Sequence, residues 1–127
     1  MRIAHVALWT QDLGAAVEFW KNYFHASVGE EYRSQRRPGF VSRFLTLPES
    51  GGAIELMSGP WLASNEYVEQ PGWDHIAISL GSKDMVDELA SRCRSDGILK
   101  SGPRMTGDGF YEAVIIMPDG TPVEITD

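Results

Sequence analysis

The sequence predicts an α+β fold made of two βαβββ modules, because the chain repeats itself after about 70 residues. A shift of 70 residues places His5–Leu8 on His75–Ile78, and a shift of 69 places Ile54–Leu56 on Val123–Ile125. One residue of difference in loop length reconciles the two shifts. Recurrence of the same apolar pattern at a fixed interval indicates duplication of one supersecondary unit.

The length and composition are those of a single ordinary globular domain over residues 1–127. The 127 residues are 43% hydrophobic and 23% charged, close to the average for such domains. The repeat divides this domain into a first module, 1–58, a linker, 59–72, and a second module, 73–127. Each module alone is too small to bury a sizeable core.

The first module begins with a short β-branched and apolar run over residues 3–8, which predicts a strand. Asp12 is a suitable N-cap for a helix that extends to about Phe24. The apolar residues at helical spacing are Leu13, Val17, Trp20 and Phe24. Strands are then expected at Tyr32, 40–47 and 53–57, with a Gly-Gly turn before the last.

The second module follows the same order. Residues 75–80 predict a strand, Ser82 a helix N-cap, and Gly97 the end of that helix. The predicted apolar stripe of the helix consists of Met85, Leu89 and Cys93. Strands are expected at Leu99, 111–117 and 122–125, the last two joined by a Pro-Asp-Gly turn.

Charge and cysteine content exclude several classes of function. With 11 basic and 18 acidic residues, the net charge is −7, which argues against binding to nucleic acid or to an anionic membrane surface. Cys93 is the only cysteine, so an internal disulfide is excluded and a reducing compartment is favoured; we expect it to be a packing residue. No apolar run approaches the roughly 18 to 20 residues that span a bilayer. The sequence therefore predicts a cytoplasmic protein with a small-molecule ligand.

Four residues related by the repeat carry the candidate chemistry. His5 and His75 lie in the first strand of each module, and Glu55 and Glu124 in the last, all flanked by apolar residues. A lone strand histidine is most often a hydrogen-bonded core residue, and a lone strand glutamate usually faces solvent. Ionised carboxylates among apolar neighbours are costly unless they are paired or bind a metal. Imidazole and carboxylate together suit divalent ions such as Zn²⁺, Ni²⁺ or Co²⁺, so the repeated pairs favour a metal site.

These residues stand in motifs that resemble the vicinal oxygen chelate superfamily, and within it glyoxalase I (lactoylglutathione lyase). The matching segments are His5–Leu8 with Asp12-Leu13, Glu18–Trp20, Ile54–Leu56, Asp74–Ala77, and Pro118–Gly120 leading to Val123–Ile125. The resemblance implies that the two modules form an open, incomplete β-barrel with a metal ion inside. It also implies that the two histidines and two glutamates, His5, Glu55, His75 and Glu124, are the ligands of one divalent ion per site, which Ni, Zn, Co or Mn would satisfy.

The same resemblance implies the reaction. Glyoxalase I isomerises the hemithioacetal of methylglyoxal and glutathione by moving a proton between adjacent carbons through an enediolate. A divalent cation stabilises the negative oxygens, and a carboxylate acts as general base. By this resemblance Glu124 is the principal base and Glu55 the second catalytic carboxylate. Members of the family commonly form homodimers whose sites lie between chains, with His5 and Glu55 from one chain and His75 and Glu124 from the other.

Two departures from the glyoxalase I pattern concern the thiol. Trp9 stands where an arginine usually holds a glutathione carboxylate, and Gly59 stands where an asparagine usually makes a further contact. Arginines are concentrated in the first module, at 33, 36, 37 and 43. Of these, Arg36, Arg37 or Arg43 either supplies a substitute anion site or lies on a solvated face. The alternatives are therefore another enzyme of the superfamily (an epimerase, a thiol transferase or a dioxygenase) or a metal-free drug-binding resistance protein. The four ligands argue against the metal-free alternative.

Overall fold

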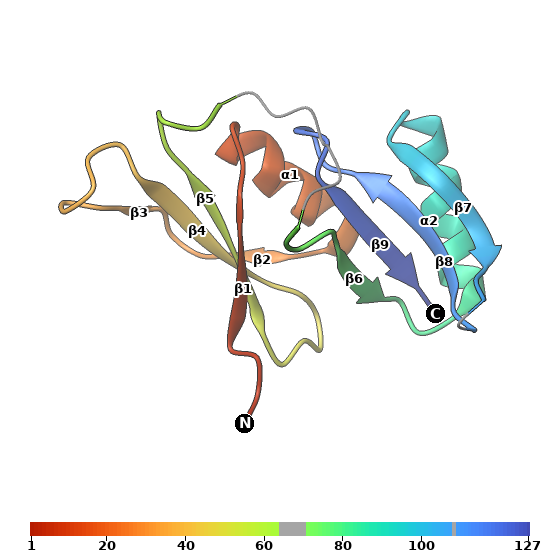
Figure 1. The fold of residues 1–127 in the computed structure, drawn as a ribbon. Helices are drawn as coiled ribbons and strands as arrows, with labels where there is room; N and C mark the ends of the chain where they lie inside the picture. Colours follow the sequence, from red (N-terminus) through yellow and green to blue (C-terminus); the bar gives the residue numbers. More distant parts are fainter. Residues whose placement is uncertain (64–70, 108) are drawn as a thin grey trace. The chain divides into compact units, whose positions relative to one another are not determined.

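The computed structural model describes residues 1–63, 71–107 and 109–127, and it divides into two compact units, residues 1–65 and 66–127. Of the predicted linker 59–72, residues 64–70 lie outside the described part of the chain. Each unit contains one helix and one sheet (Figure 1). None of the helices in the described ranges is long and apolar enough to cross a membrane.

Unit 1 is a sheet with one helix inserted between its first two strands. Its elements are β1 (His5–Trp9), α1 (Leu13–Phe24), β2 (Ser27–Val28), β3 (Tyr32–Arg33), β4 (Val41–Thr46) and β5 (Ala53–Ser58). The strand order is β1-β5-β4-β2, and β3 also pairs with β4. The first and last strands, β1 and β5, run parallel, whereas β4 is antiparallel to its neighbours.

Unit 2 has the same topology. Its elements are β6 (Ile76–Ser79), α2 (Lys83–Ser95), β7 (Leu99–Met105), β8 (Tyr111–Ile116) and β9 (Pro122–Thr126), in the order β6-β9-β8-β7. Again the first and last strands are parallel and the others antiparallel. The prediction of an α+β fold with two βαβββ modules is confirmed, and neither sheet closes on itself. The modules differ in one strand: β7 is continuous, whereas its counterpart is split into β2 and β3.

Both helices begin at the predicted residues. The Asp12 carboxylate accepts a hydrogen bond from the Ala15 amide at 2.9 Å, and the Ser82 hydroxyl accepts one from the Met85 amide at 3.3 Å. These side chains satisfy amides that have no partner within the helix. After α2, Gly97 adopts a positive φ of 76°, the left-handed conformation that glycine tolerates and that ends many helices.

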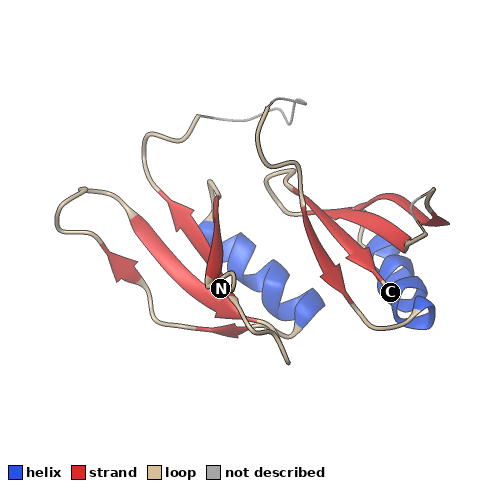
Figure 2. Ribbon diagram, turned by 60° about the horizontal axis from the view of Figure 1, so that its bottom comes forward, coloured by secondary structure: helices blue, strands red, loops and turns tan. Residues whose placement is uncertain are grey.

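Each helix packs on one face of its own sheet and leaves the other face without a helix (Figure 2). Because strand side chains alternate between faces, Ile54 and Leu56 of β5 lie on one face and are buried, and the same holds for Val123 and Ile125 of β9. The buried core residues include Trp20, Leu45, Leu56, Val86, Ile115, Val123 and Ile125. Residues on the opposite face are the candidates for function.

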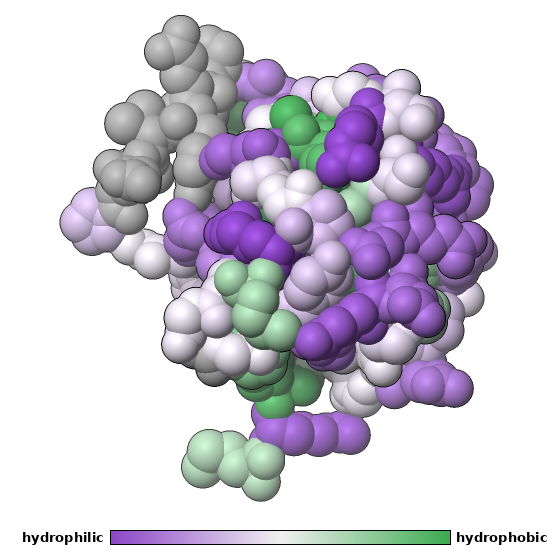
Figure 3. Space-filling model, turned by 90° about the vertical axis from the view of Figure 1, so that its right-hand side faces the viewer, coloured by the Kyte–Doolittle hydropathy of each residue, from purple (hydrophilic) through white to green (hydrophobic). Residues whose placement is uncertain are grey.

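The buried face of α2 is shifted by one residue position from the predicted apolar stripe. Met85 is exposed, and the buried residues are Val86, Ala90 and Cys93. Helical geometry allows Cys93 to share a face with residues three and seven positions earlier as well as four and eight, and the smaller pair lies against the sheet. The outer face of α2 is polar, and Figure 3, which views the molecule from that side, shows a mostly hydrophilic surface with small hydrophobic patches.

Candidate functional site

The strand registers place the predicted ligands at equivalent positions in the two units. Ala7 pairs with Glu55 across β1 and β5, and Ala77 pairs with Glu124 across β6 and β9. His5, in β1, stands two residues before its alanine and so lies on the same face as Glu55. His75 directly precedes β6, which begins one residue later than predicted, and its contact with Glu124 places it on that glutamate's face. In both units this is the face that carries no helix. The pairing inferred from the repeat therefore has a structural counterpart in each sheet.

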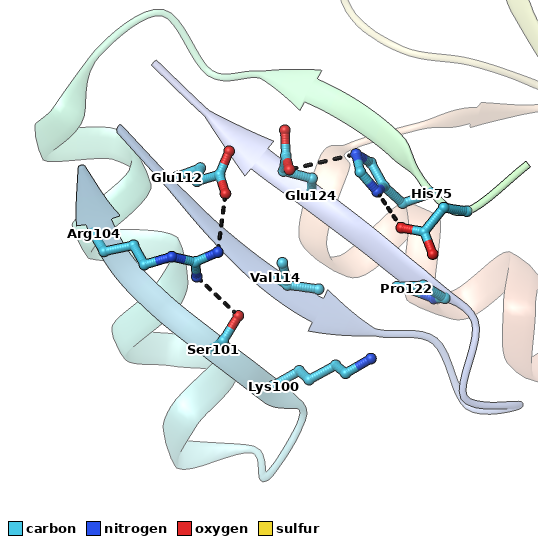
Figure 4. Close-up of a pocket in the computed structure, with 9 residues that line it drawn as sticks. His75, Lys100, Ser101, Arg104, Glu112, Val114, Pro122 and Glu124 are labelled. Atoms are coloured by element: carbon cyan, nitrogen blue, oxygen red, sulfur yellow. Dashed lines mark hydrogen bonds and ion pairs between the residues drawn. The ribbon is translucent and has the colours of Figure 1, made fainter. Parts of the chain in front are cut away.

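In unit 2 the histidine and the glutamate meet in a cavity of about 330 Å³ on that face (Figure 4). The His75 Nε2 atom lies 3.4 Å from Glu124 Oε2, and its Nδ1 atom lies 2.7 Å from Asp74 Oδ2. Glu124 is largely buried, with 15% of its side chain exposed. His75 thus lies between two carboxylates and within reach of both.

The contact with Asp74 determines which nitrogen of His75 is available. An ionised carboxylate only accepts hydrogen bonds. Nδ1 therefore carries the ring proton and donates a hydrogen bond to the Asp74 carboxylate. In neutral His75 the Nε2 atom then directs its lone pair at Glu124. Two electron-pair donors face each other at 3.4 Å, an arrangement that a shared cation or an additional proton stabilises.

These donors fit a divalent metal ion. Two ligands about 2.0 to 2.2 Å from a tetrahedral ion lie roughly 3.3 to 3.5 Å apart, and the His75–Glu124 distance of 3.4 Å falls in that range. Metal-binding histidines usually donate their other ring N–H to a carboxylate, which is the position of Asp74. Across the part of the chain that the structure describes, no three His, Cys, Asp or Glu side chains form a metal-binding group.

His5 and Glu55 share a face of the unit 1 sheet. His5 is exposed, and its ring packs edge-on against Phe44, with ring centroids 5.4 Å apart. Phe44 is the β4 residue that pairs with Glu55, which is half-buried. The four predicted ligands therefore divide into one pair in each unit.

The far side of the unit 2 cavity holds residues that sequence reasoning did not single out. Arg104 donates hydrogen bonds to Ser101 Oγ at 3.1 Å and to Glu112 Oε1 at 3.2 Å. Lys100 also lines the cavity. Ser101 and Arg104 are three residues apart, so a regular strand would direct them to opposite faces. Shifts of register in β7 between Leu99 and Ser101, and between Ser101 and Arg104, are a feature that the sequence pattern did not indicate.

The two departures from the glyoxalase I pattern belong to one aromatic cluster in unit 1. Trp9 makes edge contacts with Phe40 and Trp61, at centroid distances of 5.9 and 6.2 Å. The Arg37 guanidinium lies 3.9 Å above the Trp61 ring. A side chain at Gly59 would overlap that ring, so this cluster requires glycine there.

Two arginines of the first module make local contacts. Arg43 donates a hydrogen bond to the Gly29 carbonyl oxygen at 3.2 Å, and Arg33 forms an ion pair with Glu31. Cys93 is buried, as predicted, and burial raises the pKa of its thiol to about 11, with a further increase from Asp96. The thiol is therefore protonated near neutral pH and is a packing group.

The fold agrees with the comparison to known families. Residues 2–125 match the Glyoxalase/Bleomycin resistance protein/Dioxygenase superfamily. The chain belongs to this superfamily. An uncharacterized protein of Pseudomonas aeruginosa is 30% identical over 109 residues, which are 80% of this chain and 70% of that protein.

Two solved structures of superfamily members share the fold. A glyoxylase/bleomycin resistance protein/dioxygenase domain from Frankia sp. aligns with a TM-score of 0.85 at 18% identity, covering 99% of this chain and 96% of that one. The trypanothione-dependent glyoxalase I of Leishmania major aligns with a TM-score of 0.76 at 22% identity, covering 100% of this chain and 86% of the other. At these identities the likeness establishes the fold, and the activity has to be argued from the site.

Proposed function

We propose that this superfamily member is a metal-dependent, glyoxalase I-like lyase that isomerises the hemithioacetal of a 2-oxoaldehyde and a thiol. The observation that carries the proposal is the His75–Glu124 pair, 3.4 Å apart and backed by Asp74 at 2.7 Å. The equivalent register of His5 and Glu55 supports their assignment as the second half of the ligand set. Family membership makes chemistry on vicinal oxygen atoms the expected class of reaction.

His5, Glu55, His75 and Glu124 would hold the ion, and imidazole with carboxylate oxygen suits Ni²⁺, Zn²⁺, Co²⁺ or Mn²⁺. When bound, the ion supplies a Lewis acid that stabilises negative charge on the substrate oxygens. Asp74 holds the His75 ring in one orientation and one tautomer. The protein thereby presents the ligating nitrogen in a preset direction.

Glu124 is the residue that we assign as general base. It extends into the cavity from β9 (Figure 4), where its carboxylate takes the proton from the carbon that bears sulfur and hydroxyl. The electron pair left on that carbon forms the enediolate with the neighbouring carbonyl. Glu124 then returns the proton to the neighbouring carbon, and transfer of the hydroxyl proton completes a 2-hydroxythioester. Glu55 is assigned as the second catalytic carboxylate.

We further propose that the protein is a homodimer in which the site combines His5 and Glu55 of one chain with His75 and Glu124 of the other. Each unit supplies one His/Glu pair, so a complete set of four requires two different units. Sedimentation of the metal-loaded protein tests this arrangement, which predicts a dimer. A protein that binds the ion and still sediments as a monomer would contradict this arrangement.

The experiment that tests the activity measures isomerisation of methylglyoxal hemithioacetals with each of the four metal ions. Because the glyoxalase I of Leishmania major is described as trypanothione-dependent, the assay includes trypanothione, glutathione and 2-mercaptoethanol. We expect turnover that requires metal and that falls at least a thousandfold in Glu124→Gln. Glu88→Gln, on the exposed face of α2, is the matched control. Absence of turnover with every metal and thiol would reject the proposal.

A further inference from the structure

The cavity of unit 2 has a cationic wall opposite the His75–Glu124 pair. Arg104 lies on this wall, half-exposed, with 50% of its side-chain surface accessible. Two hydrogen bonds fix its guanidinium, one to Ser101 and one to Glu112. A guanidinium has five N–H donors, so several remain for a ligand in the cavity.

The backbone places this arginine in the cavity by an irregularity. Gly102 has a positive φ of 89°, and the register of β7 shifts on either side of Ser101. Irregularities of this kind re-aim side chains and are frequent beside active sites. Here the shift brings Ser101 and Arg104 to the same face, where the Ser101 hydroxyl accepts a hydrogen bond that orients the Arg104 guanidinium.

The buried Glu112 carboxylate needs a cationic partner, and Arg104 meets that need. If Arg104 served only to pair with Glu112, it would need neither its hydrogen bond to Ser101 nor its half-exposed position over the cavity. Both features are expected of a guanidinium that also binds a ligand, because a fixed planar fork recognises a carboxylate in a defined orientation.

The strand pairing gives the spacing between this arginine and the reacting end. Arg104 pairs with Glu112, and Glu112 pairs with Thr126, two residues beyond Glu124 on β9. Two strand spacings and this offset separate the backbones of Arg104 and Glu124 by roughly 12 Å. With β8 between their strands, Arg104 and Glu124 both line the cavity (Figure 4). A substrate therefore spans it with a few bonded atoms between its reacting carbons and an anionic group.

We propose that Arg104 is a specificity-determining residue that binds a carboxylate on the substrate, so that the preferred substrate is an anionic thiol adduct. The assignment to the substrate of an isomerase rests on the proposed function. Binding of the carboxylate itself does not require turnover. This proposal places an anion-binding arginine in the second unit, in addition to the anion site that the sequence suggested for the arginines of the first module.

A binding experiment with two matched probes tests the proposal. The probes are 3-(methylthio)propionate and its neutral amide, titrated by calorimetry into metal-free and zinc-loaded protein. We expect wild type to bind the carboxylate about tenfold more tightly than the amide, the lower end for hydrogen bonds to a charged group because Arg104 is half-exposed. Arg104→Gln should abolish the preference, whereas Arg94→Gln, on the exposed face of α2, should keep it.

Loss of the arginine leaves Glu112 without its cationic partner and could impair folding. A second variant therefore keeps the test decisive if the single variant misfolds. The double variant Arg104→Gln/Glu112→Gln removes both charges and should lose the preference equally. Equal binding of the two probes by wild type, binding of neither, or an unchanged preference in both variants would overturn the proposal.

Kinetics separate this inference from the proposed function. If wild type turns over methylglyoxal adducts, Arg104→Gln should raise KM for the 3-mercaptopropionate adduct about tenfold and leave KM for the 2-mercaptoethanol adduct unchanged. If wild type turns over neither adduct, the proposed function fails, and the probe titration still decides whether Arg104 binds a carboxylate.

Discussion

The hydrogen bond between Asp74 and His75 offers the sharpest test of the metal binding that we propose for His75 and Glu124. Asp74 accepts from Nδ1 at 2.7 Å and thereby keeps the Nε2 lone pair directed toward Glu124. Removing such an outer carboxylate typically costs 10- to 100-fold in metal affinity. Because the Asp74 side chain is 64% exposed, solvent screens its charge, and we expect Asp74→Asn to lie at the lower end. The loss should be about tenfold, or roughly 1.4 kcal/mol.

Competition with a chromophoric chelator measures this loss for Zn²⁺ in wild type and variant. Asp84→Asn provides the same chemical change on α2, on the opposite side of the sheet, and should leave the affinity unchanged. Asp74→Ala should cost at least as much as Asp74→Asn, because it also removes the acceptor atom. An affinity for Asp74→Asn within twofold of wild type, or an equal loss in Asp84→Asn, would refute the role assigned to Asp74.

Three further predictions concern the framework of unit 2. Gly102→Ala should destabilise the protein by about 2 kcal/mol or more in urea denaturation, since a Cβ there would lie 2.7 Å from the Glu112 carbonyl oxygen at a positive φ; Gly107→Ala, with open space around it, should have an effect of less than about 0.5 kcal/mol. Because the pKa of Cys93 is raised from 9.0 to about 11, the thiolate population at pH 8 is about 100-fold smaller than in the unfolded chain; alkylation should therefore be slow in native protein and rapid in denaturant, and equal rates would contradict the burial. The hydrogen bond from Tyr111 to Asp87, 2.7 Å long, stabilises the neutral phenol and raises the pKa of Tyr111, so Asp87→Asn should lower it, as followed by phenolate absorbance; an unchanged titration would contradict this cause.

The fold and the equivalent placement of the two His/Glu pairs could be predicted from the sequence, because both depend on short periodicities. Alternation along a strand sets which face a side chain occupies, so His75 and Glu124 could be placed on one face once the repeat aligned their strands. The helix starts were predictable for a similar reason, because an N-cap is a local interaction within four residues.

Other features depend on geometry that no local pattern encodes. The position of Arg104 arises from the register shift around Gly102 and Pro103, which reverses the face expected from alternation. The burial of Val86 rather than Met85 depends on which side chains fit against the sheet. The role that we propose for Asp74 rests on its 2.7 Å contact with the His75 ring, since the sequence motif showed only that the two residues are adjacent.

The central claim is that residues from both units bind one ion together, and calorimetric titration with Zn²⁺ of wild type and four single variants tests it most directly. The variants are His5→Gln, Glu55→Gln, His75→Gln and Glu124→Gln. We predict one ion per chain and a loss of affinity of at least tenfold in every variant. Wild-type affinity in the His5 and Glu55 variants, with loss confined to the other two, would contradict a site shared between the units.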